Sequence, residues 1–170
     1  MILASTDMIT IRNATIDDID KISGLEALCF PANEAASREA FKGRLLYYPE
    51  HFWLLFEDDL LISFIDGFVT NERDLKDEMY DSPNMHDESG DWQMIFGINT
   101  LQKYRKQGYA STLIDHVIKE AKAQKRKGVV LTCKEKLIPF YEKIGFINEG
   151  ISSSVHGNTV WYQMRYAFNY

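Results

Sequence analysis

The segment from Trp92 to Lys125 constrains the fold most strongly, because it predicts a buried strand that passes through a tight turn into a long helix. The apolar run from Met94 to Ile98 is typical of a buried strand. After the turn, Gly108 to Lys125 places its apolar residues on one helical face. Gly97, inside the strand, indicates a bulge or a close approach of another backbone. A strand–helix–strand unit of this kind predicts a parallel pair within an α/β (α+β) fold.

The turn spans Gln102 to Ser111, and Arg105, Gly108 and Ala110 form an Arg-x-x-Gly-x-Ala pattern within it. Gly108 allows close backbone approach, and Ala110 keeps the first helical turn narrow. A helix N-terminus attracts anions through its free N–H groups and its positive dipole end, and Arg105 and Lys106 add two positive charges. These features favour a pyrophosphate-binding turn. An ordinary strand-to-helix connection shows the same pattern, so the turn alone leaves both interpretations open.

A second motif, Leu137 to Phe146, decides between these interpretations. It reads L-I-P-F-Y-E-K-I-G-F and resembles the L-x-P-F-Y-x-x-x-G-F segment of the GNAT acetyltransferases. The Arg-x-x-Gly-x-Ala turn resembles the acetyl-CoA motif of the same superfamily and lies at the expected distance upstream. The resemblance runs from about Met8 to Met164, which is nearly the whole chain.

Three further segments follow the order seen in one branch of that superfamily, the arylalkylamine (serotonin) N-acetyltransferases. They are Glu26 to Phe30, Tyr48 to Glu50 and Leu61 to Gly67. The resemblance implies the GNAT fold, with a mixed central sheet of about six to seven strands and flanking helices. We expect a single domain over residues 8–170, with residues 1–7 as an N-terminal extension.

The patterns along the chain agree with that fold. Thr15 or Asp17 is expected to cap the first helix, and Ser37 the second. Residues 71–91 are polar and acidic, and a segment of this length is expected to be functional or disordered. Strands are expected at residues 9–12, 51–56, 60–69, 92–100, 128–133, 146–150 and 159–166, and helices at about 15–29, 37–48, 75–79, 108–125 and 137–143.

The resemblance also implies acetyl-CoA as co-substrate. Tyr141 matches the family's tyrosine that protonates the departing thiolate, and packing beneath the cofactor is the alternative role for its ring. A preplaced backbone N–H is expected to stabilise the oxyanion after the Gly97 irregularity. The residues expected to bind the cofactor are Ile98, Asn99, Thr100, Arg105, Lys106, Gln107, Gly108, Tyr109, Ala110, Ser111 and Tyr141.

The general base does not carry over from the resemblance. Two histidines form a proton route in the vertebrate arylalkylamine enzymes, and Met94 and Phe96 occupy their positions here. Neither side chain can carry a proton. The substitutes that we consider are Glu34, His86, Asp91, Asp66 and a chain of waters, with Glu34 favoured.

The acceptor is expected to be a small primary amine, similar to an arylalkylamine or a polyamine, that binds near Phe30, Glu34 and Trp161. Residues 1–99 carry a net charge of −13 and residues 100–170 a net charge of +7. This asymmetry suits a cationic acceptor and a polyanionic cofactor. A peptide acetyltransferase and a non-catalytic acetyl-CoA-binding module are the alternatives. Residues 71–91 folded over the acceptor site would favour the small amine.

Composition excludes other classes. The acidic pI of about 5.2 argues against nucleic-acid binding, and no apolar run reaches the length of a membrane helix. No signal peptide is recognisable, so we expect a cytoplasmic protein. Cys29 and Cys133 are expected to be buried free thiols. We expect no metal, and the sequence leaves association into a homodimer open.

Overall fold

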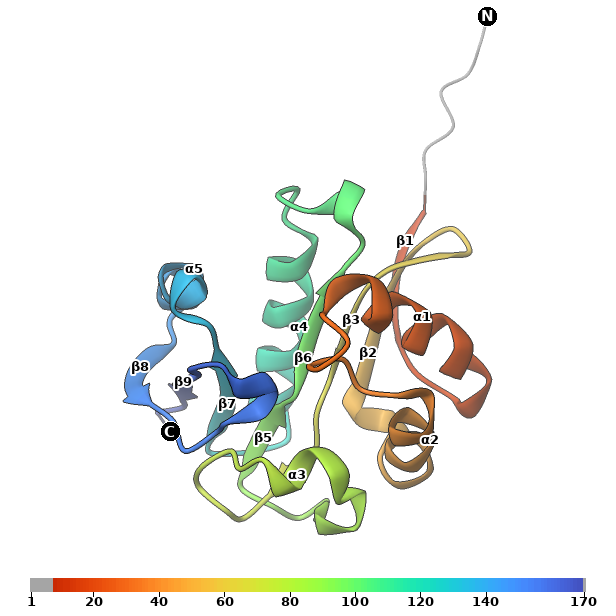
Figure 1. Ribbon diagram of the computed structural model, residues 1–170. Coiled ribbons are helices and arrows are strands. Elements are labelled where there is room, and N and C mark those ends of the chain that lie inside the picture. The colour runs from red at the N-terminus through yellow and green to blue at the C-terminus, as the bar shows by residue number, and fades with distance from the viewer. Residues whose placement is uncertain (1–7, 170) are drawn as a thin grey trace, which may run out of the picture.

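The computed structural model describes residues 8–169, as two β-sheets flanked by helices (Figure 1). The predicted N-terminal extension, residues 1–7, lies outside the described residues. Within them the strands are β1 (Ile9–Asn13), β2 (Phe52–Glu57), β3 (Leu60–Asp66), β4 (Val69–Thr70), β5 (Trp92–Ile95), β6 (Gly97–Thr100), β7 (Gly128–Cys133), β8 (Ile147–Ile151) and β9 (Tyr162–Ala167). The helices are α1 (Ile19–Cys29), α2 (Arg38–Tyr47), α3 (Glu78–Asp81), α4 (Tyr109–Ala123) and α5 (Ile138–Ile144).

The sheets confirm the predicted fold class. One sheet has the order β1-β2-β3-β6 and is antiparallel throughout. The other has the order β4-β5-β7-β9-β8, and its β5–β7 pair is parallel. Helix α4 connects β6 to β7 and makes the crossover that a parallel pair requires. Two predicted strands, 60–69 and 92–100, are each divided in the structure, into β3 with β4 and into β5 with β6.

The division between β5 and β6 separates the two sheets. Ile95 is the last residue of β5 and pairs with Leu131 of β7. Gly97 is the first residue of β6 and pairs with Asp66 of β3, in the other sheet. The strand therefore changes partner at Phe96, and the two sheets diverge from that point. The sequence signal for this break was Gly97, where an irregularity was expected.

Local signals place the helix starts as predicted. Thr15 forms a capping box with Asp18 in the 3₁₀ turn that leads into α1. Ser37 caps α2, and its Oγ accepts from Ala40 N at 3.1 Å. The short helix expected at 75–79 instead spans Glu78–Asp81, and Leu75 is buried in the core before it.

Two apolar cores lie on opposite sides of the sheets. One includes Ile22 and Phe41 of the first two helices, and the other includes Val117 of α4. Burying each such side chain contributes about 1.5–3 kcal/mol. The two cysteines are free thiols, as predicted; Cys133 is buried and Cys29 is half-buried. Among the described residues, no helix is both long and apolar enough to cross a membrane.

Candidate active site

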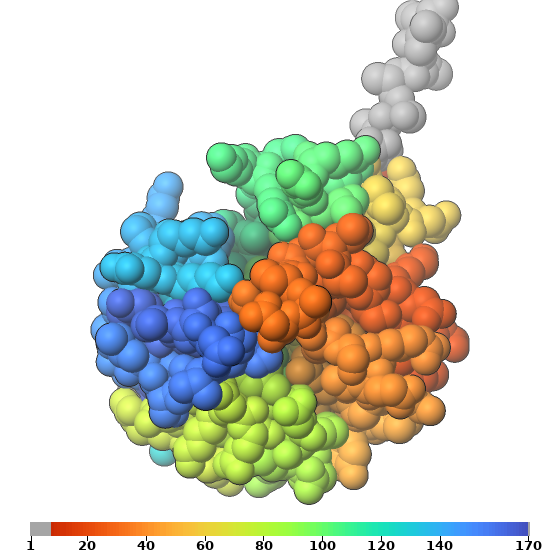
Figure 2. All heavy atoms as spheres, viewed as in Figure 1, coloured from red at the N-terminus to blue at the C-terminus, as the bar shows by residue number. Residues whose placement is uncertain are grey.

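A cavity of about 740 Å³ opens where the two sheets diverge. Its wall includes β6, the start of α4, helix α5, the loop after α1, part of residues 71–91 and the turn before β9. In Figure 2 a hollow lies between the green turn before α4, the cyan residues of α5 and the orange loop after α1. Six segments from different parts of the chain thus share one cavity.

The start of α4 forms one end of this cavity. Gly108 has φ +88° and is followed by the helix without a side-chain cap. The first hydrogen bond of this turn runs from Thr112 N to Gly108 O at 3.0 Å. The N–H groups of Tyr109, Ala110 and Ser111 therefore precede the helical ladder and are free to bind an anion. A Cβ atom on Gly108 would meet no other atom within 4 Å, so the space beside this turn is open.

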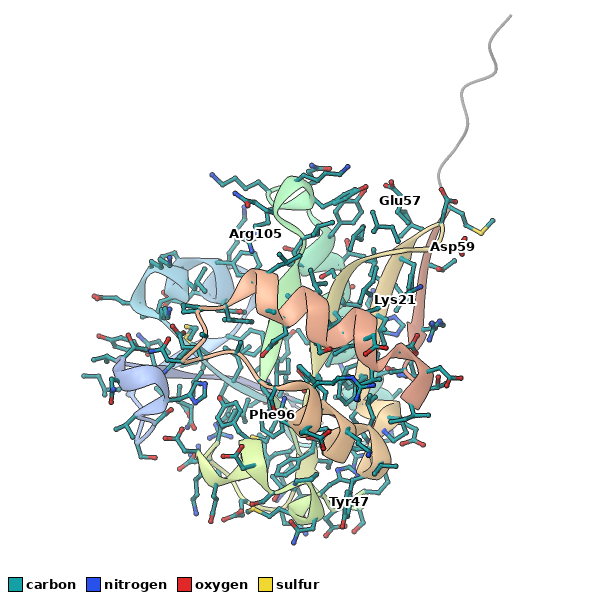
Figure 3. All side chains as sticks on the ribbon, turned by 45° about the vertical axis from the view of Figure 1, so that its right-hand side comes forward. Lys21, Tyr47, Glu57, Asp59, Phe96 and Arg105 are labelled. Carbon is teal, nitrogen blue, oxygen red and sulfur yellow. The ribbon has the colours of Figure 1, made fainter. Side chains whose placement is uncertain are left out.

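Most of the predicted cofactor residues share this region. Arg105 Nε donates to Thr100 O at 3.0 Å and so ties the turn to the end of β6. Figure 3 shows Arg105 beside the turn before α4, while Phe96 lies well below it, level with α2 and α3. The predicted cofactor residues that line the cavity are Ile98, Thr100, Arg105, Lys106, Gly108, Tyr109, Ala110, Ser111 and Tyr141.

Two predicted cofactor residues do not line the cavity. Asn99 is fully buried on the other side of β6 from Ile98, and its carbonyl oxygen accepts from Ser63 Oγ at 2.7 Å. Gln107 is exposed, and its amide donates to Lys103 O at 2.9 Å. The Asn99 side chain lies on the Gly97 side of β6, next to Asp66 and Glu26, and is fully covered there.

Tyr141 lies in α5 and is only 6% exposed, yet it lines the cavity. Burial, together with the neighbouring Cys133, raises the pKa of its phenol well above the usual range. The hydroxyl is therefore protonated at neutral pH and remains able to donate. Edge contacts with Phe140 and Phe146, at 5.1 and 5.7 Å between ring centres, hold the ring in place.

The predicted acceptor residues Phe30, Glu34 and Trp161 also line the cavity. The Glu34 carboxylate is held by Lys134, whose Nζ lies 2.9 Å from Oε1 and 3.1 Å from Oε2. His156 Nε2 donates to Glu34 O at 2.8 Å, and Trp161 Nε1 donates to His156 O at 2.7 Å. These bonds connect the loop after α1 to the turn before β9 across the acceptor end.

Residues 71–91 close the same end. Asp77, Tyr80 and Asp81 line the cavity. Asp77 accepts from Ser154 Oγ at 2.5 Å and from Val155 N at 3.0 Å. Tyr80 stacks on the His156 ring, with 5.2 Å between ring centres and 13° between planes. The yellow-green residues of this segment pack against the blue residues before β9 in Figure 2.

The other proposed bases fall into two groups. Asp66 lines the cavity but is ion-paired with the buried Arg44 at 2.8 Å. Asp91 lies outside the cavity lining, 3.3 Å from Lys127 Nζ. His86 also lies outside it. Met94 is buried in the core and Phe96 lines the cavity. Neither position supplies a proton carrier, because neither side chain has a group that titrates.

His86 instead belongs to a cluster with His51 and Glu88, whose potential ligand atoms all lie within 4.8 Å of one another. Glu88 Oε2 lies 2.7 Å from His51 Nε2 and 2.8 Å from His86 Nε2. His86 Nδ1 accepts from Val69 N at 3.0 Å, so the neutral ring carries its proton on Nε2, toward Glu88. These distances and this tautomer fit a hydrogen-bonded cluster.

Glu26, like Asp77 and Asp81, is an acidic residue of the cavity that the sequence analysis does not name as a base. It lies in α1, is 6% exposed and lines the cavity. Its Oε2 accepts from Ala36 N at 2.8 Å. A signal was present in the sequence, because Glu26 follows Ile22 by four residues and precedes Cys29 by three. A carboxylate at that spacing lies on the apolar face of the helix.

Comparison with known proteins shows the family and the fold of this chain. The model of the acetyltransferase (GNAT) family matches residues 19–146. The serotonin N-acetyltransferase of Mesocricetus auratus is 27% identical over 111 residues, which are 65% of this chain and 52% of that protein. The chain thus spans about half the length of this curated relative.

Solved structures show the same fold. The loading GNATL domain of CurA from Lyngbya majuscula superposes with a TM-score of 0.82 at 18% identity, over 95% of this chain and 98% of that one. The GphF GNAT-like decarboxylase, in complex with isobutyryl-CoA, has a TM-score of 0.81 at 20% identity, over 93% and 98%. Because the family model covers most of the chain and includes both motifs of the cavity, this chain belongs to the GNAT family of acetyltransferases.

Proposed function

We propose that this protein transfers an acetyl group from acetyl-CoA to a primary amine, by direct attack within a ternary complex. The acceptor is a small cation similar to an arylalkylamine or a polyamine. One observation carries the proposal: a single cavity joins an anion-binding helix start to an acceptor end that is rich in carboxylates and aromatic rings.

The residues at the helix start fit acetyl-CoA. The N–H groups of Tyr109, Ala110 and Ser111, with the charges of Arg105 and Lys106, would hold its pyrophosphate. The open space beside Gly108 admits a bulky ligand. Acetyl-CoA supplies an acetyl group that is activated as a thioester. The division of the strand at Phe96 frees backbone groups of β6 to face that group and to stabilise an oxyanion.

Tyr141 supplies the acid. Its hydroxyl is protonated at neutral pH, and it lies in the wall of the same cavity. In the proposed reaction it donates a proton to the departing thiolate sulfur, as a general acid does.

The acceptor end suits a small cation. Among the described residues, five carboxylates line the cavity, namely those of Glu26, Glu34, Asp66, Asp77 and Asp81. Aromatic rings of Phe30, Tyr80, Phe96 and Trp161 lie between them, and such rings attract ammonium groups. The relative described as serotonin N-acetyltransferase supports an amine acceptor.

The closed acceptor end argues against a peptide acceptor. Contacts from Asp77 to Ser154 and from Glu34 to Lys134 and His156 bridge the segments around it. An extended chain that entered along this side would have to break them. A non-catalytic module would not need a tyrosine hydroxyl in the cavity wall, where Tyr141 lies.

An amine panel tests the proposal. Release of free thiol from acetyl-CoA would be followed with arylalkylamines, polyamines, peptides and no acceptor. We expect turnover with one of the small amines and only background release with peptides. Faster turnover with peptides would favour the peptide acetyltransferase. Saturable acetyl-CoA binding without turnover on any acceptor would favour the non-catalytic module.

A further inference from the structure

Three polar side chains converge on Gly97, the first residue after the sheets diverge. A Cβ atom placed on Gly97 would lie 3.5 Å from Asn99 Nδ2, 3.6 Å from Asp66 Oδ1 and 3.7 Å from Glu26 Oε1. Gly97, Asp66 and Glu26 all line the cavity. The Glu26 carboxylate thus lies beside the backbone of β6, at the point where the proposed reaction takes place.

The surrounding residues orient the Glu26 carboxylate, but no cation in the described part of the chain forms an ion pair with it. The backbone N–H of Ala36 binds Oε2 at 2.8 Å and orients the carboxylate. Within residues 8–169, no lysine or arginine forms an ion pair with Glu26. The nearby cation, Arg44, is engaged with Asp66 at 2.8 Å. Glu34 differs in this respect, because Lys134 holds its carboxylate in an ion pair.

The surroundings of Glu26 favour its protonated form near neutral pH. Burial is the largest cause, and the negative charge of Asp66 from β3 is the second. The Ala36 N–H, the charge of Arg44 from α2 and the Asn99 side chain from β6 oppose them more weakly. Together they raise the pKa of Glu26 to about 7. A base with a pKa near the working pH accepts a proton and releases it again readily.

We propose that Glu26 is the general base, whose carboxylate takes the proton that the acceptor ammonium must lose before its nitrogen attacks. The inference rests on the proposed N-acetyltransferase function. Two protons leave the nitrogen in all. The first passes to Glu26 and then to solvent at the cavity mouth. The second leaves as the C–N bond forms and the C–S bond breaks, and it replaces the proton that Tyr141 gives to the sulfur.

The test compares the wild type with Glu26→Gln, which keeps an oxygen for the Ala36 N–H. For the best amine of the panel, we expect kcat/KM of the wild type to rise with pH through about 7. Glu26→Gln should lower it roughly 10²- to 10⁴-fold and remove that rise. Binding of acetyl-CoA, measured by thermal shift, should be unchanged. Glu39→Gln, an exposed glutamate in α2, is the matched control and should behave as the wild type.

A weakly basic amine separates the base from other roles. A fluorinated analogue of the same acceptor, already neutral at pH 7, needs no first proton transfer. Glu26→Gln should therefore acetylate it at a rate much closer to that of the wild type. An equal loss on both amines would mean that Glu26 only shapes the cavity, and would overturn the assignment. Glu34→Gln tests the competing base: if that variant loses the rise near pH 7, Glu34 is the base.

Stability supplies a readout that is independent of activity. The folded pKa of about 7 lies above that of an unfolded glutamate, about 4.3. The folded state therefore binds the proton more tightly, and its stability is lost as the pH rises between these values. The urea midpoint of Glu26→Gln relative to the wild type should rise across that window, whereas that of Glu39→Gln should not.

Failure of the proposed function and failure of the base assignment give different results. A wild type that acetylates no amine would overturn the proposed function, and the assignment of the base would fall with it. An active wild type with an equally active Glu26→Gln would overturn the base alone. If Glu26→Gln does not fold, the same measurements on Glu26→Asp and the pH dependence of the wild-type kcat/KM test the assignment of the base. A kcat/KM that does not change with pH near 7 would exclude Glu26.

Discussion

Single residues of the cavity owe their properties to their neighbours rather than to their type. Glu26, Glu34 and Asp66 are all carboxylates in one cavity, yet Lys134 pairs with Glu34 and Arg44 pairs with Asp66. Glu26 forms no ion pair among the described residues, and its burial beside the negative charge of Asp66 raises its pKa. The three residues therefore have different chemical capacities.

Tyr141 gives a prediction at the same scale. Tyr141→Phe removes the hydroxyl and keeps the ring contacts with Phe140 and Phe146, so the fold should survive. Turnover at saturating amine and acetyl-CoA should fall roughly 10²- to 10⁴-fold, because the leaving thiolate has lost its proton donor. Acetyl-CoA affinity, measured by calorimetry, should change little, because the loss falls on the transition state.

Tyr47→Phe is the control for this variant, since Tyr47 is exposed on α2. Normal turnover of Tyr141→Phe would show that water protonates the sulfur. Lost affinity with unchanged turnover at saturation would make Tyr141 a cofactor contact, the alternative role that its sequence position allows.

At the scale of elements, the proposed acetyl-CoA site depends on the start of α4. Gly108→Val adds a side chain in the open space beside the free N–H groups. It also strains the backbone, because φ +88° disfavours a β-branched residue. We expect acetyl-CoA to raise the melting temperature of the wild type, as a ligand that binds only the native state does. Gly108→Val should lose that rise.

Gly150 provides a matched control for strain. Its φ is +93°, a Cβ atom there would also meet nothing within 4 Å, and it lies in β8, outside the cavity lining. Gly150→Val should therefore lose similar stability, about 1–3 kcal/mol, and keep the acetyl-CoA effect. Equal responses of the two variants to acetyl-CoA would show that the anion-binding turn lies elsewhere.

At the scale of the whole molecule, the charge asymmetry of the sequence becomes an asymmetry of the cavity. The five lining carboxylates all belong to residues 1–99. Of the lining cations, Arg105, Lys106, Lys134 and Lys136 belong to residues 100–170, and Arg44 does not. The fold therefore brings the acidic and basic parts of the chain together around one space, with the basic turn at the end proposed for the cofactor.

This distribution predicts the salt dependence of the reaction. Cationic amines should be preferred over neutral acceptors of the same shape, because the carboxylates attract them. Raising the salt concentration should lower kcat/KM for the cationic amine more than for its neutral isostere, since ions screen exposed charges. The ratio of the two values, measured from low to high salt, checks this. A ratio that does not change would remove the electrostatic argument for the acceptor.

The sequence by itself determined the features that depend on neighbours along the chain. Thr15 and Ser37 cap helices as expected, because capping bonds join residues only a few positions apart. The strand–turn–helix around Gly108 and the motif that contains Tyr141 were also recognisable, and they sufficed to predict the family that the comparisons confirm.

Tertiary structure alone decided which side chains meet. The strand 92–100 divides at Phe96 because its two halves pair with strands of different sheets. The sequence of a strand does not specify which other strands it will pair with. Residues 71–91 close the cavity through bonds to Ser154 and Val155, far along the chain. Glu26 faces Gly97 only because α1 packs on β6. Its burial beside Asp66, and therefore its raised pKa, arises from contacts between segments that local sequence patterns do not encode.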